Sequence, residues 1–220
     1  MSKLHDHKVA FRDRASIAKL ALWLWKQAAA FTSAFDICAF IEGPLSEYLK
    51  NKGPLRIRLH SERGLPEGAY VEFNPLTLHV TKKIWEDAKK GLDYARYILA
   101  HEIGHLVLHD KRAQAFSRDK SVSLKFVLDE QSCETQAHWF AEYFLVPDHL
   151  VNLYKIAELI ETACVVPKEI AEKRVKDFNS TNKLLKIFYE NDICLNCGNL
   201  SVHNGCECTV CGKQPPLMKG

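Results

Sequence analysis

The chain has 220 residues, of which 47% are hydrophobic, and its formal net charge is +3 at pH 7. A chain of this length can bury a sizeable core, and so small a net charge gives no argument for nucleic acid as its main partner. Residues 1–16 contain no apolar segment followed by a small-residue cleavage site. We therefore expect a cytoplasmic protein without a secretory signal.

The most hydrophobic stretch covers residues 17–41, but charged residues interrupt it. A membrane-spanning helix needs about 20 predominantly apolar residues, so we expect no membrane insertion. Apolar residues recur at helical spacing within residues 12–30, which predicts a core helix there. A second, short helix is expected over residues 45–50.

Three segments with strand character follow. Residues 55–60 alternate apolar and polar side chains, as a half-buried strand does. Residues 69–73 and 77–81 have strand composition on either side of Asn74-Pro75. We expect the three segments to form a small antiparallel sheet.

The remainder of the chain before residue 190 has mainly helical periodicity. The predicted helices cover residues 84–90, 93–109, 128–145, 148–162, 167–177 and 181–189. A small sheet between helical regions places the protein in the α+β class.

The predicted helix over residues 93–109 contains the sequence His101-Glu102-Ile103-Gly104-His105. Two histidines four residues apart lie on one face of a helix, so both imidazoles can bind one metal ion. Glu102 lies beside that face and can act as a base on a water molecule without binding the metal. The alternative is a pair of surface or core histidines that bind no metal.

A catalytic zinc ion needs a third protein ligand, and we predict that Glu134 supplies it. Glu134 lies on the next long helix, where Ala137 and Ala141 are spaced so that two helices can pack closely. A site with two histidines and one glutamate results.

Three other residues compete with Glu134 for this position: Glu130, His138 and His109. Each can instead hold a ligand in place through a hydrogen bond. Glu130 can also be an ordinary solvated charge on a helix, and both histidines can be purely structural.

The segments HEIGHLVLH and ETQAHWFAEYFLVP together resemble the ImmA/IrrE-type metallo-endopeptidases, whose pattern is roughly HExGHxxLH followed by ExxANxFAxxLLxP. The resemblance implies zinc ligands at His101, His105 and Glu134 and a catalytic glutamate at Glu102. The chain departs from the family pattern at His138, where asparagine is usual, and at Phe144, which replaces a leucine.

The resemblance also implies a minimal gluzincin-like peptidase core of helices and a small antiparallel sheet. Members of the family add a segment similar to a helix-turn-helix, for which residues 154–177 are the candidate. Their substrates are often helix-turn-helix repressors of mobile-element or stress genes, so we expect a transcriptional repressor as the protein substrate.

In the implied reaction, Glu102 accepts a proton from the water that attacks a peptide carbonyl and passes it to the leaving amine. A hydrogen-bond donor should stabilise the carbonyl oxygen, and Tyr143, His138 and His109 are all candidates. We expect an edge of the sheet, at residues 76–81, to bind the substrate as an added strand.

The C-terminal region contains two CxxCG elements, formed by Cys194 and Cys197 and by Cys208 and Cys211. Two such elements facing each other make a tetrahedral structural zinc site, which depends on metal to fold. Cys206 is expected to be a spare thiol. Few basic or aromatic residues lie nearby, which favours protein recognition by this zinc ribbon over nucleic-acid binding.

The other three cysteines, Cys38, Cys133 and Cys164, lie in apolar surroundings and are expected to be buried thiols. The predicted organisation is a zinc peptidase domain over residues 1–147, a helical extension over 148–190 and a zinc ribbon over 191–220. The chain is thus expected to bind two zinc ions, one catalytic and one structural.

The alternative function is that of a zinc-binding regulatory protein that binds a repressor or DNA without proteolysis. Glu102 favours the enzyme, because a purely structural metal site needs no general base.

Overall fold

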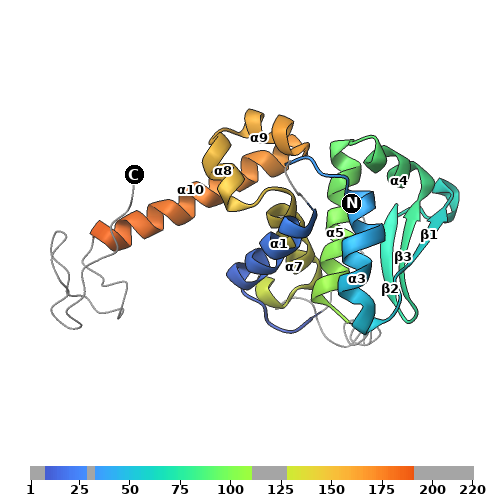
Figure 1. Cartoon of the computed structure of the whole chain (residues 1–220). Coiled ribbons are helices and arrows are strands. Elements are labelled where there is room, and N and C mark those ends of the chain that lie inside the picture. Colours follow the sequence, from blue (N-terminus) through green and yellow to red (C-terminus); the bar gives the residue numbers. More distant parts are fainter. Residues whose placement is uncertain (1–7, 29–32, 111–127, 191–220) are drawn as a thin grey trace. The chain divides into compact units, whose positions relative to one another are not determined.

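A computed structural model of the chain describes residues 8–28, 33–110 and 128–190 (Figure 1). It divides the chain into two compact units, residues 1–174 and residues 175–220. The first unit contains the sheet and most of the helices, whereas the described part of the second is the C-terminal portion of helix α10 (Lys168–Glu190). The predicted zinc ribbon lies outside the described residues, and the three predicted domain ranges stay predictions.

The N-terminal helices cover one side of the core. Helix α1 (Arg14–Ala28) buries Ile17, Ala21 and Leu24, in agreement with the predicted helix. The short helix expected over residues 45–50 is part of a longer helical run, which consists of α2 (Ile37–Phe40), the π-helical turn η1 (Ile41–Leu45), α3 (Ser46–Leu49) and the 3₁₀ turn η2 (Lys50–Lys52). This run begins early because the Asp36 carboxylate accepts hydrogen bonds from the first free backbone N–H groups, at 2.9 and 3.0 Å.

All three predicted strands are present, as β1 (Arg56–His60), β2 (Ala69–Phe73) and β3 (Leu76–Thr81). Their order is β1-β3-β2, and the sheet is mixed rather than wholly antiparallel. Strands β2 and β3 form an antiparallel hairpin around Asn74-Pro75, whereas β1 pairs with β3 in parallel. The segment between β1 and β2, which includes η3 (Glu62–Gly64), is long enough to place β2 on the far side of β3.

Strand β3 is the central strand of this sheet, and all six of its residues are buried. Both of its edges are already paired. The prediction that residues 76–81 offer an edge to a substrate is therefore wrong, and β1 and β2 are the outer strands of the described sheet.

Helix α5 (Asp93–Leu108) occupies the centre of the first unit (Figure 1). It contacts strand β2 and helix α4 (Lys82–Lys89), and it packs along helix α7 (Cys133–Leu145), which in turn packs against α1. Ten of the sixteen residues of α5 are buried, so the helix is a fixed part of the core.

Helix α7 begins later than the sequence indicates. The hydroxyl of Ser132 caps it by accepting a 3.0 Å hydrogen bond from the backbone N–H of Thr135. The residues before the cap form the separate 3₁₀ turn η5 (Asp129–Gln131), so Glu130 lies outside the helix predicted over residues 128–145. Its backbone carbonyl instead accepts a hydrogen bond from the N–H of Arg12, at 2.9 Å.

Small residues allow α5 and α7 to approach closely. A Cβ atom on Gly104 would lie 3.0 Å from both the Cα and the carbonyl oxygen of Ala137, closer than packed carbon atoms normally come. Ala137 and Ala141 are fully buried. The predicted role of the small residues of α7 in helix packing agrees with this contact.

The predicted helices after residue 147 differ in their boundaries. The segment expected to be one helix is divided into α8 (Asp148–Tyr154) and α9 (Ala157–Cys164), with Lys155 in the left-handed conformation between them. The two helices expected after Pro167 are instead continuous in α10. Among the described helices, none combines the length and the apolar composition needed to cross a membrane.

Candidate metal centre

The first turn of α7 faces the two histidines of the HExxH sequence on α5. Nε2 of His101 lies 3.4 Å from one carboxylate oxygen of Glu134, and Nε2 of His105 lies 3.5 Å from the other. The two imidazole rings are nearly perpendicular, with centroids 4.7 Å apart. The structure thus brings together the three residues predicted as ligands of the catalytic metal.

Three overlapping groups of potential ligand atoms lie in this region, each with all its atoms within 4.8 Å of one another. Their members are His101, Glu102 and His105; His101, Glu134 and His138; and His105, His109 and Cys133. All of these residues come from α5 and α7 or immediately follow α5, so the packing of these two helices sets the geometry of the site.

Nε2 of His101 is buried and lies 3.4 Å from the Glu134 carboxylate, but it makes no regular hydrogen bond to any described residue. A buried polar atom of this kind is costly unless something binds it, and a metal ion between the imidazole and the nearby carboxylates would satisfy it. Neutral imidazole and carboxylate are also the ligands that zinc accepts. The residues present therefore fit a metal ion.

The electrostatics of His101 favour a positive charge at this point. Burial lowers the pKa of His101, but the interactions with Glu102 and Glu134 outweigh it and raise the pKa to about 9. Nδ1 of His101 lies 3.2 Å from Oε1 of Glu102. Because two carboxylates lie close to this buried ring, the site attracts a cation, whether a proton or a metal ion.

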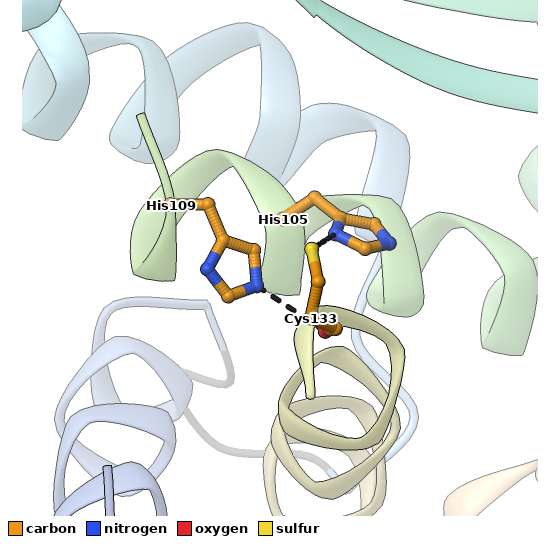
Figure 2. A group of neighbouring side chains, drawn as sticks. All are labelled: His105, His109 and Cys133. Atoms are coloured by element: carbon orange, nitrogen blue, oxygen red, sulfur yellow. Dashed lines mark hydrogen bonds between the residues drawn. The ribbon is translucent and has the colours of Figure 1, made fainter. Parts of the chain in front are cut away.

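His109 continues the histidine row of α5 but points to a different partner. Its Nε2 donates a hydrogen bond to the backbone carbonyl of Cys133 at 3.3 Å (Figure 2). Burial lowers the pKa of His109 to about 4, so the ring is neutral near pH 7. His109 therefore connects the end of α5 to the start of α7, beside the predicted ligands.

Cys133 also contacts the second histidine of the motif. Its Sγ lies 3.4 Å from Nδ1 of His105 (Figure 2). Cys133, Cys38 and Cys164 are all buried thiols, as the sequence predicts. The hydrogen bond between His105 and the sulfur was not expected from the sequence, although the position of Cys133 immediately before Glu134 is a signal for it.

His138 lies against the first histidine of the motif, with the two ring centroids 4.4 Å apart. The hydroxyl of Tyr97 lies 2.9 Å from Nδ1 of His138. Burial raises the pKa of Tyr97, so the phenol keeps its proton and can donate it to this nitrogen. Burial, aided by the charge of His101, lowers the pKa of His138 to about 4, which leaves its ring neutral near pH 7.

A cavity of about 370 Å³ opens beside this pair and is lined in part by Tyr97, Thr135, His138 and Trp139. Thr135 follows Glu134 directly in the sequence, and His138 belongs to one of the metal-binding groups. The cavity therefore reaches the candidate metal centre through His138, the residue that the two have in common.

Two predicted candidates lie elsewhere. The ring of Tyr143 is covered by the guanidinium groups of Arg14 and Arg174, 5.8 and 4.0 Å from its centroid. Glu130 belongs to the turn before α7, as described above. Cys194, Cys197, Cys208 and Cys211, the predicted ligands of the structural zinc, lie outside the described residues.

The family comparison agrees with this geometry. A family model described as the IrrE N-terminal-like domain, Peptidase_M78, matches residues 59–176, which is more than half of the chain. The match includes the sheet from Leu59 onward, both helices of the candidate metal centre and the start of α10. No curated protein and no solved structure gives a match.

Proposed function

Because the chain belongs to the peptidase family defined by the IrrE N-terminal-like domain, we propose that it is a zinc-dependent endopeptidase. The observation that supports this most strongly is the meeting of His101 and His105 with the carboxylate of Glu134, at 3.4 and 3.5 Å. These three residues would hold the zinc ion. When bound, zinc would supply Lewis acidity, which makes a water molecule easier to deprotonate and polarises a peptide carbonyl.

In this proposal Glu102 is the general base. It is 7% exposed, and one of its carboxylate oxygens lies 3.2 Å from Nδ1 of His101, so it is held beside the predicted ligands. Glu102 would accept a proton from the attacking water and deliver it to the amine that leaves when the peptide bond breaks.

We assign the stabilisation of the carbonyl oxygen to His138. Of the three residues that the sequence leaves open, His109 donates to the Cys133 carbonyl and Tyr143 is covered by two arginines. His138 lines the cavity and lies against His101. If Tyr97 donates to its Nδ1, the remaining proton of the neutral ring is on Nε2, and that N–H can donate to a substrate.

We propose that the substrate is a regulatory protein of the cytoplasm, a helix-turn-helix repressor of a mobile element or stress response. The test is incubation of the zinc-loaded chain with a repressor encoded beside it, followed by mass spectrometry. Cleavage is expected for the wild type and not for Glu102→Gln. A repressor that stays intact with zinc-loaded wild-type protein contradicts this choice of substrate.

The described part of α10 gives little support to DNA binding. Arg174 is 1% exposed and donates to the carbonyl of Val146 and to the carboxylate of Asp148, while Lys173 pairs with the buried carboxylate of Glu142. These two cations, which could have contacted phosphates, instead hold the helix to the peptidase core. This arrangement favours the peptidase over the regulatory alternative.

A further inference from the structure

The two ring nitrogens of His105 face different groups. Nε2 lies 3.5 Å from Glu134, where the proposed zinc would bind, and Nδ1 lies 3.4 Å from Sγ of Cys133. A histidine that binds a metal through Nε2 must carry its proton on Nδ1. That proton then points at the sulfur atom.

We propose that Cys133 is a positioning residue for the metal ligand His105. Its sulfur accepts the hydrogen bond from Nδ1 and so fixes both the protonated nitrogen and the angle of the ring. In most metal sites this role belongs to a carboxylate, a backbone carbonyl or water. The inference rests on the proposed function, because it takes His105 to be a zinc ligand.

Three observations show that the residue carrying this sulfur is fixed in place. Cys133 is 5% exposed, it is the first residue of α7 after the Ser132 cap, and its carbonyl accepts the hydrogen bond of His109. Figure 2 shows Cys133 between His105 of α5 and His109, the residue that directly follows α5. Since Glu134 is the next residue, the same helix start positions both the proposed carboxylate ligand and the partner of His105.

The grouping of His105, His109 and Cys133 within 4.8 Å raises a different possibility, namely that Cys133 binds a metal directly. The geometry favours the positioning role. Sγ faces Nδ1 of His105 rather than Nε2, and Nε2 of His109 is engaged with the carbonyl of Cys133. A metal at this second position would have to displace both hydrogen bonds.

The first test measures zinc affinity of the full chain by competition with a chelator. Of the zinc bound by the chain, the catalytic zinc is identified as the equivalent that the His101→Ala variant no longer binds. Cys133→Ala should weaken the binding of this zinc about tenfold. This is at the low end of what is lost when the hydrogen-bond partner of a metal ligand is removed, because sulfur is a weak acceptor. Cys133→Ser should restore most of the affinity, and Cys164→Ala, which truncates another buried cysteine, should leave it unchanged.

The second test observes the hydrogen bond itself. In zinc-loaded protein, the Nδ1–H resonance of His105 should be sharp and protected from exchange by NMR. It should broaden in Cys133→Ala, recover in Cys133→Ser and stay unchanged in Cys164→Ala. A general effect on folding would change many resonances of the protein and not the Nδ1–H resonance of His105 alone.

Three results overturn the inference. If zinc affinity and the Nδ1–H resonance are the same in Cys133→Ala and Cys164→Ala, Cys133 does not position His105. If Cys133→Ser removes a sulfur-to-cobalt absorption band from the cobalt-substituted chain, Cys133 is a direct ligand. If the wild type holds no zinc that depends on His101, the proposed function fails, and this inference fails with it.

Discussion

At the scale of single residues, the candidate centre is defined by two carboxylates, Glu102 and Glu134, that lie close to the imidazoles of the motif. His101 is the clearest case, because interactions with Glu102 and Glu134 more than offset the burial that disfavours its charged form. Without metal, the raised pKa of His101 favours a proton on this ring near pH 7. Protons and zinc must therefore compete for this residue.

We predict that zinc affinity rises with pH up to about 9, because His101 must lose a proton to become a ligand and its pKa is raised to about 9. In metal-free protein, the raised pKa of His101 contributes to the free energy of unfolding. This contribution is fully present below about pH 6.5 and is lost as the pH rises through about 9. Chelator competition across this range measures the first effect. An affinity that stops rising near pH 6.5 contradicts the account.

The two glutamates near the start of α7 should behave differently. Glu134→Ala should remove one zinc equivalent, because it removes the carboxylate that meets both histidines. Glu130→Ala should keep the full zinc content, since the hydrogen bonds of Glu130 are made by its backbone carbonyl. Elemental analysis of the purified variants measures this. Loss of zinc in Glu130→Ala would mean that the wrong glutamate is assigned.

At the scale of elements, the site depends on the distance between α5 and α7. Gly104 sets this distance, because a side chain there would meet the backbone of Ala137. The two histidines of the motif belong to α5, and Glu134 belongs to α7. A change in helix separation should therefore reach the metal centre directly.

Gly104→Ala should lower the free energy of unfolding by about 1–3 kcal/mol, as overpacked cores do, and should weaken zinc binding. Gly43→Ala is the matched control, since a Cβ at Gly43 would meet no atom within 4 Å beyond its chain neighbours and the backbone of its own helical turn. Chemical denaturation and chelator competition report the two effects. Equal results for the two variants would show that the close helix contact is unimportant.

The helices of the site could be predicted because their signals are local. The spacing of His101 and His105, and the small residues after Glu134, are properties of single helices. The pairing of β1 with β3 could not be predicted, because it depends on the path of the connecting segment rather than on strand composition. The contacts of Cys133 and Tyr97 also escaped prediction, since each joins two helices that face each other only after packing.

At the scale of the whole molecule, the described structure contains one candidate metal centre, while the sequence predicts a second at Cys194, Cys197, Cys208 and Cys211. We predict two zinc equivalents per chain. Replacing Cys194 and Cys211 by serine should remove one equivalent and leave the other sensitive to Glu134→Ala. Zinc analysis of the combined variants checks this. A wild-type chain with a single zinc that survives the cysteine changes contradicts the predicted ribbon.

We propose that the metal centre on α5 and α7 hydrolyses peptide bonds. The most direct measurement exposes a proteome-derived peptide mixture to zinc-loaded wild type and to zinc-loaded Glu102→Gln, and identifies new peptide termini by mass spectrometry. We predict internal cleavages with the wild type that are absent with Glu102→Gln, although both proteins retain the zinc. The same set of termini from both proteins, or none from either, would contradict the account.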